Sequence, residues 1–430
     1  MNIVVVALGK IGLPLAVQYA WSGHSVVGAD VNPAVVADVA VAREPSPGEA
    51  HLAQRLAEVV GAGRLRATTD TTAAVRGAEA VVIVVPLVTD GAGVPDFGAL
   101  DAATAAVAAG LQPGTLVLFE TTLPVGVTRG RFLPALEQGS GLRAADGGLH
   151  LAFSPERVLT GRVFADLRRY PKLVGGVDGA SAAAAVHFYG EVLQFDERPD
   201  LDRPNGVWDL GSAEAAELAK LAETTYRDVN IALANQLALY AESHGIDVHQ
   251  VIAASNSQPY SHLHTPGMSV GGHCIPVYPR LFLWGAPGAT VVTAAREANL
   301  AMPAHAVARL AERAGGLSGA RVAVLGAAYR AGVKETAFSG VFSLVEEVRA
   351  RGGHPLVHDP LFSDAELVAL GLQPYHLGEP VDAALVHTDH PGYSEIGPDD
   401  LPGVRVLLDG RRVTTAARWP AEVRLVLGAG

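Results

Sequence analysis

The sequence predicts an α/β chain with two Rossmann-like, doubly wound parallel-sheet domains joined by a long central helix. Three observations lead to this fold class. Apolar strand-like runs alternate with helical stretches over the first 200 residues, residues 212–245 form one unbroken helical pattern, and a second strand-then-glycine unit starts at residue 321. At 430 residues, the chain exceeds the size at which a single core stops growing, so two or three domains are expected.

The first unit is a strand, a glycine-rich turn, a helix, a second strand and an acidic residue. Gly9 lets the backbone approach a pyrophosphate, and Gly12 lets the helix pack closely on the strand. Asp30 is spaced to hold ribose hydroxyls and would repel a 2′-phosphate, so the pattern predicts NAD rather than NADP. Ala7 stands where the first glycine of the pattern is usual, and a purely structural turn is the alternative. The segments are 2–7, Gly9-Lys10-Ile11-Gly12, a helix to about Trp21, 25–29 and Asp30.

Further patterns complete both halves. The polar segment 200–211 contains proline and glycine and indicates a domain edge. Ser212, with Glu214 nearby, begins the long helix, and another helix is expected over about 294–315. The remaining strands are expected at 80–85, 115–119, 149–153, 172–175, 321–326, 355–358, 384–387 and 404–408. The expected domains are 1–200, 201–310 and 311–430.

Composition excludes several classes of function. A formal net charge of −12 argues against nucleic acid or an anionic membrane as the main partner. The N-terminus enters a strand directly, without the features of a secretory leader, and no stretch resembles a membrane span, so we expect a cytoplasmic protein. The chain has one cysteine, which excludes an internal disulfide and four-cysteine zinc sites, and no metal is expected.

That cysteine, Cys274, lies in the turn Gly271-Gly272-His273-Cys274-Ile275-Pro276. Two adjacent glycines allow close approach of the backbone to a ligand, which suits a reactive thiol. A free cysteine is also commonly a small buried hydrophobe. This segment alone leaves both interpretations open.

With these segments in place, the chain resembles the UDP-glucose/GDP-mannose dehydrogenase family over essentially its whole length, nearest the branch that oxidises UDP-N-acetylhexosamines. The resemblance implies oxidation of the sixth carbon of a nucleotide sugar from alcohol to carboxylate, with two NAD consumed. It also implies that the first domain holds NAD, that the last holds the nucleotide diphosphate of a UDP-sugar, and that the long helix forms the core of a homodimer. The segments that carry the resemblance are 7–14, 121–126, 154–158, 220–235, 271–276 and 409–411.

The resemblance assigns the catalytic roles. Cys274 would trap the aldehyde as a thiohemiacetal that is oxidised to a thioester. Lys220 would stabilise the developing oxyanion, Glu156 would activate the water that hydrolyses the thioester, and Thr122 would hold a water near the reacting carbon. These roles raise the reactive interpretation of Cys274 above the buried one.

Structural alternatives remain for several of these positions. Glu156 is also compatible with a surface helix cap, and Thr122 with a helix N-cap ahead of Pro124. For Glu217 and Glu223, on the same helix as Lys220, a solvated charged stripe is the favoured interpretation.

The resemblance also suggests binding residues. Arg227 and Asn235 have packing or dimer contacts as alternatives, and His273 either lowers the pKa of the thiol or contacts the sugar. The expected cofactor-binding residues are Gly9, Lys10, Ile11, Gly12, Asp30, Pro86 and Thr121. The expected substrate-binding residues are Thr224, Arg227, Asn235, Gly271, Gly272, His273, Tyr278, Arg330 and Arg411.

Departures from the family pattern cluster on the substrate side. Tyr278 replaces an aspartate four residues after the cysteine, and a phenol carries no standing negative charge at neutral pH. Thr224 replaces an asparagine, and Arg330, Glu335 and Ala337 replace a lysine, an aspartate and an arginine. An enzyme that stops at the aldehyde, or uses transient oxidation on an unusual nucleotide sugar, is therefore an alternative. A nucleotide-sugar-binding protein without catalysis is a further one.

Overall fold

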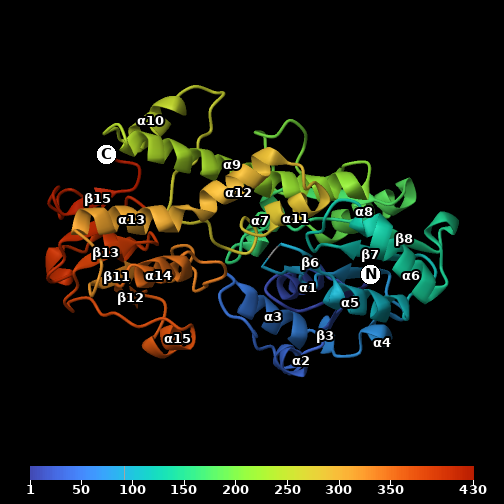
Figure 1. Cartoon of the computed structure of the whole chain (residues 1–430). Coiled ribbons are helices and arrows are strands. Elements are labelled where there is room, and N and C mark those ends of the chain that lie inside the picture. Colours follow the sequence, from blue (N-terminus) through green and yellow to red (C-terminus); the bar gives the residue numbers. More distant parts are fainter. Residues whose placement is uncertain (92) are drawn as a thin grey trace. The chain divides into compact units, whose positions relative to one another are not determined.

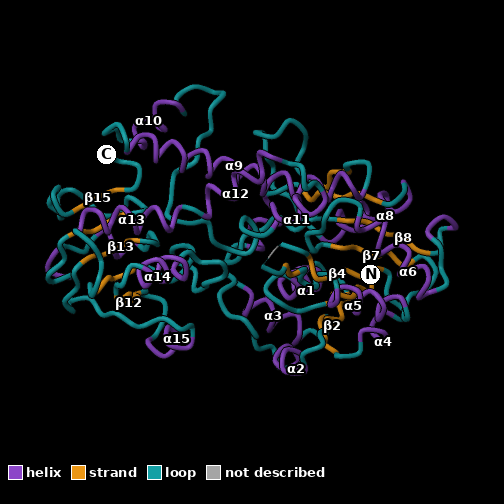
Figure 2. Tube along the Cα trace, in the orientation of Figure 1, coloured by secondary structure: helices purple, strands orange, loops and turns teal. Residues whose placement is uncertain are grey.

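The computed structural model describes residues 1–91 and 93–430, which divide by their contacts into two compact units, Met1–Ala222 and Glu223–Gly430. Helices alternate with strands along both units (Figure 1, Figure 2). The division falls inside the long helix α9 (Ala213–Glu242), which was predicted over 212–245. Ser212 caps this helix, since its Oγ accepts the Ala215 N–H at 3.2 Å. Two α/β units and a long central helix confirm the predicted fold class.

The first unit is built on a sheet that, within the described residues, holds eight strands in the order β10-β9-β8-β7-β4-β1-β2-β3. From β8 to β3 all neighbouring strands are parallel. The apolar runs of β8, β7, β4, β1 and β2 are buried on both faces, whereas β3 at the edge is partly exposed. The strands are β1 (Asn2–Val6), β2 (Ser25–Ala29), β3 (Leu65–Thr68), β4 (Ala80–Ile83), β7 (Thr115–Phe119), β8 (Leu149–Phe153), β9 (Lys172–Gly176) and β10 (Val207–Asp209), with β5 (Val88–Thr89) and β6 (Pro95–Asp96) forming a separate pair.

One edge of this sheet departs from the predicted parallel arrangement. β9 runs antiparallel to β8, and β10 runs parallel to β9. The connection from β8 to β9 returns at the same end of the sheet without crossing over it, so β9 must run the opposite way. The polar segment 200–211 contains β10 and thereby contributes to the sheet.

Helices cover the first sheet and complete its apolar core. Tyr19 of α1 packs edge to face on Phe188 of α8, with ring centroids 5.5 Å apart. The helices of this unit are α1 (Gly12–Trp21), α2 (Pro33–Ala40), α3 (Leu52–Gly61), α4 (Thr71–Val75), α5 (Gly98–Ala108), the π-helical η1 (Thr128–Phe132), α6 (Leu133–Ser140), the 3₁₀ turn η2 (Ala144–Asp146), α7 (Val163–Arg169) and α8 (Gly179–Val192).

The second unit contains a smaller parallel sheet in the order β12-β11-β13-β14-β15, with apolar clusters formed by its buried residues. Its strands are β11 (Arg321–Leu325), β12 (His354–His358), β13 (Ala383–Val386), β14 (Val406–Asp409) and β15 (Arg424–Val426). Its helices are α10 (Val248–Ser255), α11 (Tyr278–Gly285), α12 (Thr290–Leu300), α13 (Met302–Ala314), α14 (Val341–Ala350) and α15 (Asp364–Ala369), with 3₁₀ turns η3 (Pro391–Ser394) and η4 (Pro398–Asp400).

The prediction of one helix over 294–315 is wrong, because α12 and α13 are separate (Figure 2). Pro303 occupies the first turn of α13, where its missing N–H costs no hydrogen bond. Within a continuous helix the same proline would remove a hydrogen bond and clash with the preceding turn, so the chain ends one helix and begins another.

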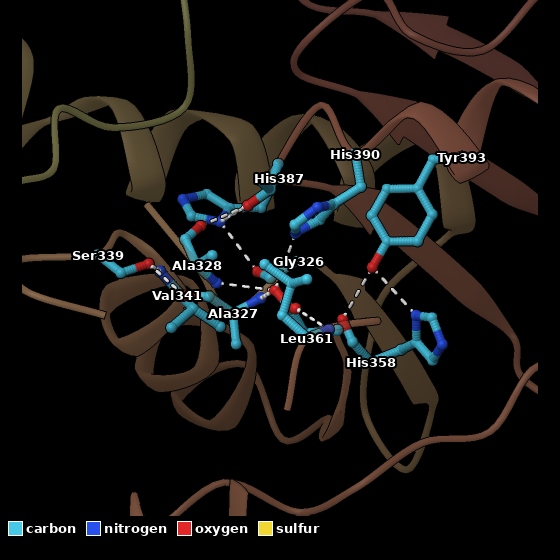
Figure 3. A network of polar contacts seen from close by, with 12 residues as sticks. Gly326, Ala327, Ala328, Ser339, Val341, His358, Leu361, His387, His390 and Tyr393 are labelled. Atoms are coloured by element: carbon cyan, nitrogen blue, oxygen red, sulfur yellow. Dashed lines mark hydrogen bonds and ion pairs between the residues drawn. The ribbon is translucent and has the colours of Figure 1, made fainter. Parts of the chain in front are cut away.

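Each sheet fixes its first strand-to-helix turn with a carboxylate that follows the neighbouring strand. In the first unit, Asp30 accepts the Leu8 N–H at 2.8 Å. In the second, Asp359 accepts the N–H groups of Ala327 and Ala328 at 2.8 and 2.9 Å, within the polar network of Figure 3. The His390 ring contacts the same carboxylate oxygen of Asp359 at 3.1 Å. The two halves therefore share one structural device at equivalent places.

Candidate active site

The glycine-rich turn after β1 has the geometry that the sequence predicts. Ala7 has a φ of +76°, a left-handed conformation that favours glycine. A Cβ on Gly12 would lie 1.8 Å from the carbonyl oxygen of Ala7, so that position requires glycine. A Cβ on Gly9 would meet nothing within 4 Å, which leaves space beside the backbone. The turn thus combines close helix–strand packing with an open approach for a ligand.

The N-terminus of α1 is suited to a phosphate. No side chain among the described residues caps α1, and its first-turn N–H groups carry the positive end of the helix dipole. Asp30 is partly exposed at the carboxyl end of β2, where Oδ1 accepts the Asn32 N–H at 2.8 Å and Oδ2 accepts the Leu8 N–H. Each oxygen keeps acceptor capacity for a ribose hydroxyl. Lys10, exposed, and Ile11, half-buried, lie in the same turn.

The loops after β4 and β7 are tied together at this edge of the sheet. The Thr121 hydroxyl donates to the carbonyl of Val85 at 2.7 Å, next to the exposed Pro86. Strand order reverses between β1 and β4, and ligands of doubly wound sheets bind outside the carboxyl ends of strands at such a point. Thr122 is buried, and the interpretation as a helix N-cap is wrong, because Val127 is the N-cap of the following helix.

Glu156 and Lys220 lie together at the carboxyl end of β8. The Lys220 ammonium donates to the main-chain carbonyl of Glu156 at 2.5 Å. Oε1 of Glu156 accepts the N–H of Arg157 at 2.6 Å and of Val158 at 3.2 Å. The interpretation of Glu156 as a surface helix cap is wrong, because its side chain is about nine-tenths buried and Arg162 is the N-cap of the next helix, α7.

Two residues that the sequence reasoning missed complete this cluster. The Lys172 ammonium donates to Glu120 Oε2 at 2.7 Å and to Glu156 Oε2 at 2.9 Å. Lys172 opens an otherwise apolar strand, and Glu120 directly precedes Thr121, at the end of a fully buried strand. A charged residue at the boundary of each buried strand was the available signal, since lysine and glutamate are rarely buried without a partner.

The interpretation of Glu217 as part of a solvated stripe is wrong, although Glu223 is exposed as that interpretation expects. Glu217 is fully buried and accepts the Gly126 N–H at 2.5 Å, the Thr128 N–H at 2.9 Å and the Thr128 hydroxyl at 2.6 Å. Burial raises its pKa to about 7, although these hydrogen bonds act in the opposite direction. Glu217 thus fastens α9 to the segment that follows Thr121 and Thr122.

In the second unit, the cysteine turn is held against the segment that follows β11. The Gly272 N–H donates to the carbonyl of Ala337 at 2.8 Å, and a Cβ on Gly271 would lie 2.6 Å from the Tyr329 Cβ. Beside them, the His273 ring contacts Glu335 at 2.6 Å. Cys274 is half-buried. The cysteine turn and the substrate-side departures Glu335 and Ala337 are therefore in direct contact.

The other predicted substrate residues of this unit differ in setting. Asn235 is buried; its amide donates to Asn299 at 2.9 Å and its oxygen accepts the Gly267 N–H at 2.9 Å, which favours the packing alternative. Thr224 is buried, whereas Arg227 is exposed. Nε of Arg330 is buried without a hydrogen-bond partner in the described part of the chain. An anionic ligand could supply the acceptor that this N–H lacks. Tyr278 opens α11, and Arg411 contacts Asp389 at 3.3 Å.

Sequence models of one family match three successive segments. The NAD binding domain of the UDP-glucose/GDP-mannose dehydrogenase family matches residues 1–193, its central domain matches 214–301, and its UDP binding domain matches 323–416. The chain belongs to this family. Members with similar sequences include a UDP-N-acetyl-D-mannosamine dehydrogenase from Pyrococcus horikoshii, 34% identical over 96% of both chains, and an NDP-N-acetyl-D-galactosaminuronic acid dehydrogenase from Ralstonia solanacearum, 31% identical over 98% of both.

Solved structures of nucleotide-sugar dehydrogenases have the same fold. The structure of UDP-D-ManNAc dehydrogenase from Pyrococcus horikoshii superposes with a TM-score of 0.88 at 32% identity and covers 100% of this chain and 99% of that one. A UDP-glucose dehydrogenase from Pyrobaculum islandicum superposes with a TM-score of 0.86 at 27% identity, covering 100% and 98%. The resemblance predicted from the sequence is confirmed.

Membership makes the chain an NAD-dependent nucleotide-sugar dehydrogenase. The residues present fit the cofactor, because the uncapped α1, the open side of Gly9 and the carboxylate of Asp30 match the pyrophosphate and ribose of NAD. Among residues 1–91 and 93–430, none of the helices is long and apolar enough to cross a membrane.

Proposed function

We propose that this dehydrogenase oxidises the C6 hydroxyl of a UDP-N-acetylhexosamine to the uronic acid in two steps. The contact between Lys220 and Glu156 carries the proposal, because it holds a cation and a carboxylate together at the sheet edge where the cofactor loops lie. Relatives named for N-acetylated hexoses support the choice of sugar. The balanced reaction converts R–CH₂OH, two NAD⁺ and one water to R–COO⁻, two NADH and three protons.

The proposal gives each side chain one task. NAD, when bound, accepts the hydride in each oxidation. Lys220 stabilises the negative charge that develops on the oxygen at C6, and Thr122 holds a water near the reacting carbon. The Cys274 thiolate adds to the aldehyde to give a thiohemiacetal, and hydride loss converts this to a thioester, so that the intermediate stays covalently attached until water hydrolyses the thioester. Glu156 accepts a proton from the water that attacks this thioester.

The binding roles follow the three domains that the sequence predicts. We propose that residues 1–200 hold NAD, that 201–310 carry the dimer contacts together with Lys220 and Cys274, and that 311–430 hold the nucleotide diphosphate. The Nε of Arg330, which is buried without a hydrogen-bond partner among the described residues, supports a phosphate contact in the last of these. Arg411 is a second candidate for such a contact, and the half-buried Tyr278 a candidate for a sugar contact.

A panel of nucleotide sugars with NADH readout and mass analysis of the product tests the proposal. We expect a UDP-N-acetylhexosamine to give two NADH and the acid. Cys274→Ala should form no acid, because the thioester cannot form. One NADH per sugar with aldehyde as the product would exclude the two-step route, and unchanged acid formation by Cys274→Ala would remove the covalent mechanism.

Tyr278 supports a second candidate function. A tyrosine at the first turn of α11, where relatives of this family are expected to carry aspartate, removes a standing negative charge four residues from Cys274. An enzyme that stops at the aldehyde, or reduces the sugar again after transient oxidation, is the corresponding alternative. It gives one NADH or none, so the same panel separates it from the leading proposal.

A further inference from the structure

A buried cation lies between two buried carboxylates in the first unit. Lys172 contacts Glu120 and Glu156 at 2.7 and 2.9 Å, and the exposed fractions of the three side chains are 5%, 0% and 10%. Tyr19 and Tyr189 add hydrogen bonds from their hydroxyls to Glu120 Oε1 at 3.0 and 2.7 Å. Both carboxylate oxygens of Glu120 thus accept hydrogen bonds from protein side chains, and these contacts hold Glu120 in place.

The strand register brings the pair together. Phe153 pairs with Gly175 and Ala152 with Gly176 in the antiparallel ladder of β8 and β9. Continued past the ends of the ladder, the same register places position 156 opposite position 172. The antiparallel edge of the sheet therefore has a specific consequence, which is to set Lys172 against Glu156.

The contacts of Glu156 fix the orientation of its carboxylate. Oε1 accepts two main-chain N–H groups, and Oε2 accepts the Lys172 ammonium. The Glu120 carboxyl group is a further hydrogen-bond neighbour of Glu156, so these contacts together hold the Glu156 carboxylate in one orientation.

Burial and the neighbouring charges shift the pKa values of this cluster in opposite directions. Burial raises the pKa of Glu120 to about 6, despite the attraction of Lys172. Burial also disfavours ionised Glu156, but the charge and hydrogen bond of Lys172 outweigh it and lower the pKa of Glu156. Lys172 stays protonated, since the two carboxylates outweigh burial and raise its pKa. Two carboxylates with pKa values pushed apart are typical of a site in which one of them serves as a base.

We propose that Lys172, anchored by Glu120, is the positioning residue that pairs with Glu156 and holds its carboxylate in the orientation from which it meets the hydrolytic water. This inference rests on the proposed role of Glu156 as the base for thioester hydrolysis. Lys172 itself touches neither substrate nor cofactor in this assignment. The titratable or charged groups that face Glu156 and its partners are Lys172 on β9, Glu120 after β7, Lys220 on α9, Tyr19 on α1 and Tyr189 on α8.

Lys172→Met tests the inference directly. Loss of the cation leaves Glu156 buried beside Glu120, so the acid limb of the pH profile of kcat should rise by at least about one pH unit. At neutral pH, kcat should fall by about 10- to 100-fold with little change in KM, since hydrolysis alone slows. Rapid acid quench and intact-protein mass analysis should show an acyl adduct on Cys274 that the wild type does not accumulate.

Three variants make the test selective. Lys172→Arg keeps a cation, so the acid limb should stay within about half a pH unit of the wild type. Glu120→Gln removes the competing carboxylate and leaves Lys172 paired with Glu156, so the limb should not rise. Arg309→Met removes a half-buried cation from its pair with Glu242 in the second unit and controls for general loss of stability.

The outcomes separate this inference from the proposed function. If Glu156→Gln accumulates the adduct but folded Lys172→Met has a wild-type pH profile and no adduct, Lys172 is not the positioning residue, and the proposed function stands. If Glu156→Gln accumulates no adduct, the base is elsewhere and both fail. Should Lys172→Met not fold, the other two variants decide, because a raised acid limb in Lys172→Arg or Glu120→Gln overturns the inference and an unraised limb in both supports it.

Discussion

At the scale of single residues, Ala7 is a strained position within the cofactor turn. Its φ of +76° costs an alanine about 1–2 kcal/mol, whereas glycine adopts that conformation without a steric penalty. Glycine also loses about 0.5–1 kcal/mol more conformational entropy on folding. The strain is therefore the larger effect, though by a small margin.

We therefore expect Ala7→Gly to raise the free energy of unfolding by about 0.5 kcal/mol, measured by urea denaturation. Ala42, with a φ of +56° outside the cofactor turn, provides the matched control. Ala42→Gly should stabilise by a similar amount, but only Ala7→Gly should change the KM for NAD. Equal effects of both variants on that KM, or destabilisation by Ala7→Gly, would contradict this account.

A local pattern in the sequence was enough to single out residues of the first strand-to-helix turn. Gly9, Gly12 and Asp30 follow from spacing within one βαβ unit, because the turn, the helix start and the second strand are close in sequence. Lys172 and Glu120 were missed because 52 positions separate them and only the pairing of β7, β8 and β9 brings them together. A helical spacing argument placed Glu217 in solvent, since periodicity describes a helix face and not what covers it.

At the scale of elements, Glu217 couples α9 to the segment after β7 through a buried carboxylate. Its folded-state pKa of about 7 exceeds the unfolded value near 4.5, and burial is the main cause. The folded state thus binds more protons than the unfolded state between these values, so stability is full below about pH 4.5 and declines as pH rises through about 7.

We expect the free energy of unfolding of the wild type, relative to Glu217→Gln, to fall by about 2–3 kcal/mol from pH 4.5 to pH 8. Chemical denaturation at several pH values measures this difference. Glu214→Gln is the matched control on the same helix, since Arg129 lowers the pKa of Glu214 and gives no decline over this range. A difference between the wild type and Glu217→Gln that is independent of pH would show that Glu217 stays ionised when folded.

The presence of strands and helices could be predicted from the sequence, whereas the direction in which a strand runs could not. Apolar runs identified β9 at nearly its observed bounds, but hydrophobicity carries no information on strand polarity. The break between α12 and α13 was readable in principle from Pro303, because proline in a helical pattern marks either a kink or a new start.

At the scale of the whole molecule, one face of α9 predicts self-association. Tyr226, Leu233 and Tyr240 recur every seven residues and are 54%, 46% and 64% exposed. Apolar residues at heptad spacing form the seam through which helices pair. The chain's family membership and this stripe together support the proposed homodimer.

We expect Leu233→Lys to convert a dimer to a monomer, as measured by light scattering with size-exclusion chromatography. A charge at the centre of the stripe would be desolvated on pairing without a partner, which disfavours association. Val368→Lys, at an apolar residue of α15 with 60% exposure, should leave the mass unchanged. A monomeric wild type, or a Leu233→Lys variant that stays dimeric, would exclude this face as the interface.

The antiparallel pairing of β8 and β9 also bears on how this enzyme can diversify. Because the ladder at 152–153 and 175–176 sets the register, the contact between Glu156 and Lys172 does not depend on the length of the chain between them. That chain contains α7, so insertions or deletions there can accumulate without separating Glu156, the proposed base, from Lys172. Selection can thus remodel this connection, and whatever contacts it makes, while the contact between Glu156 and Lys172 is kept.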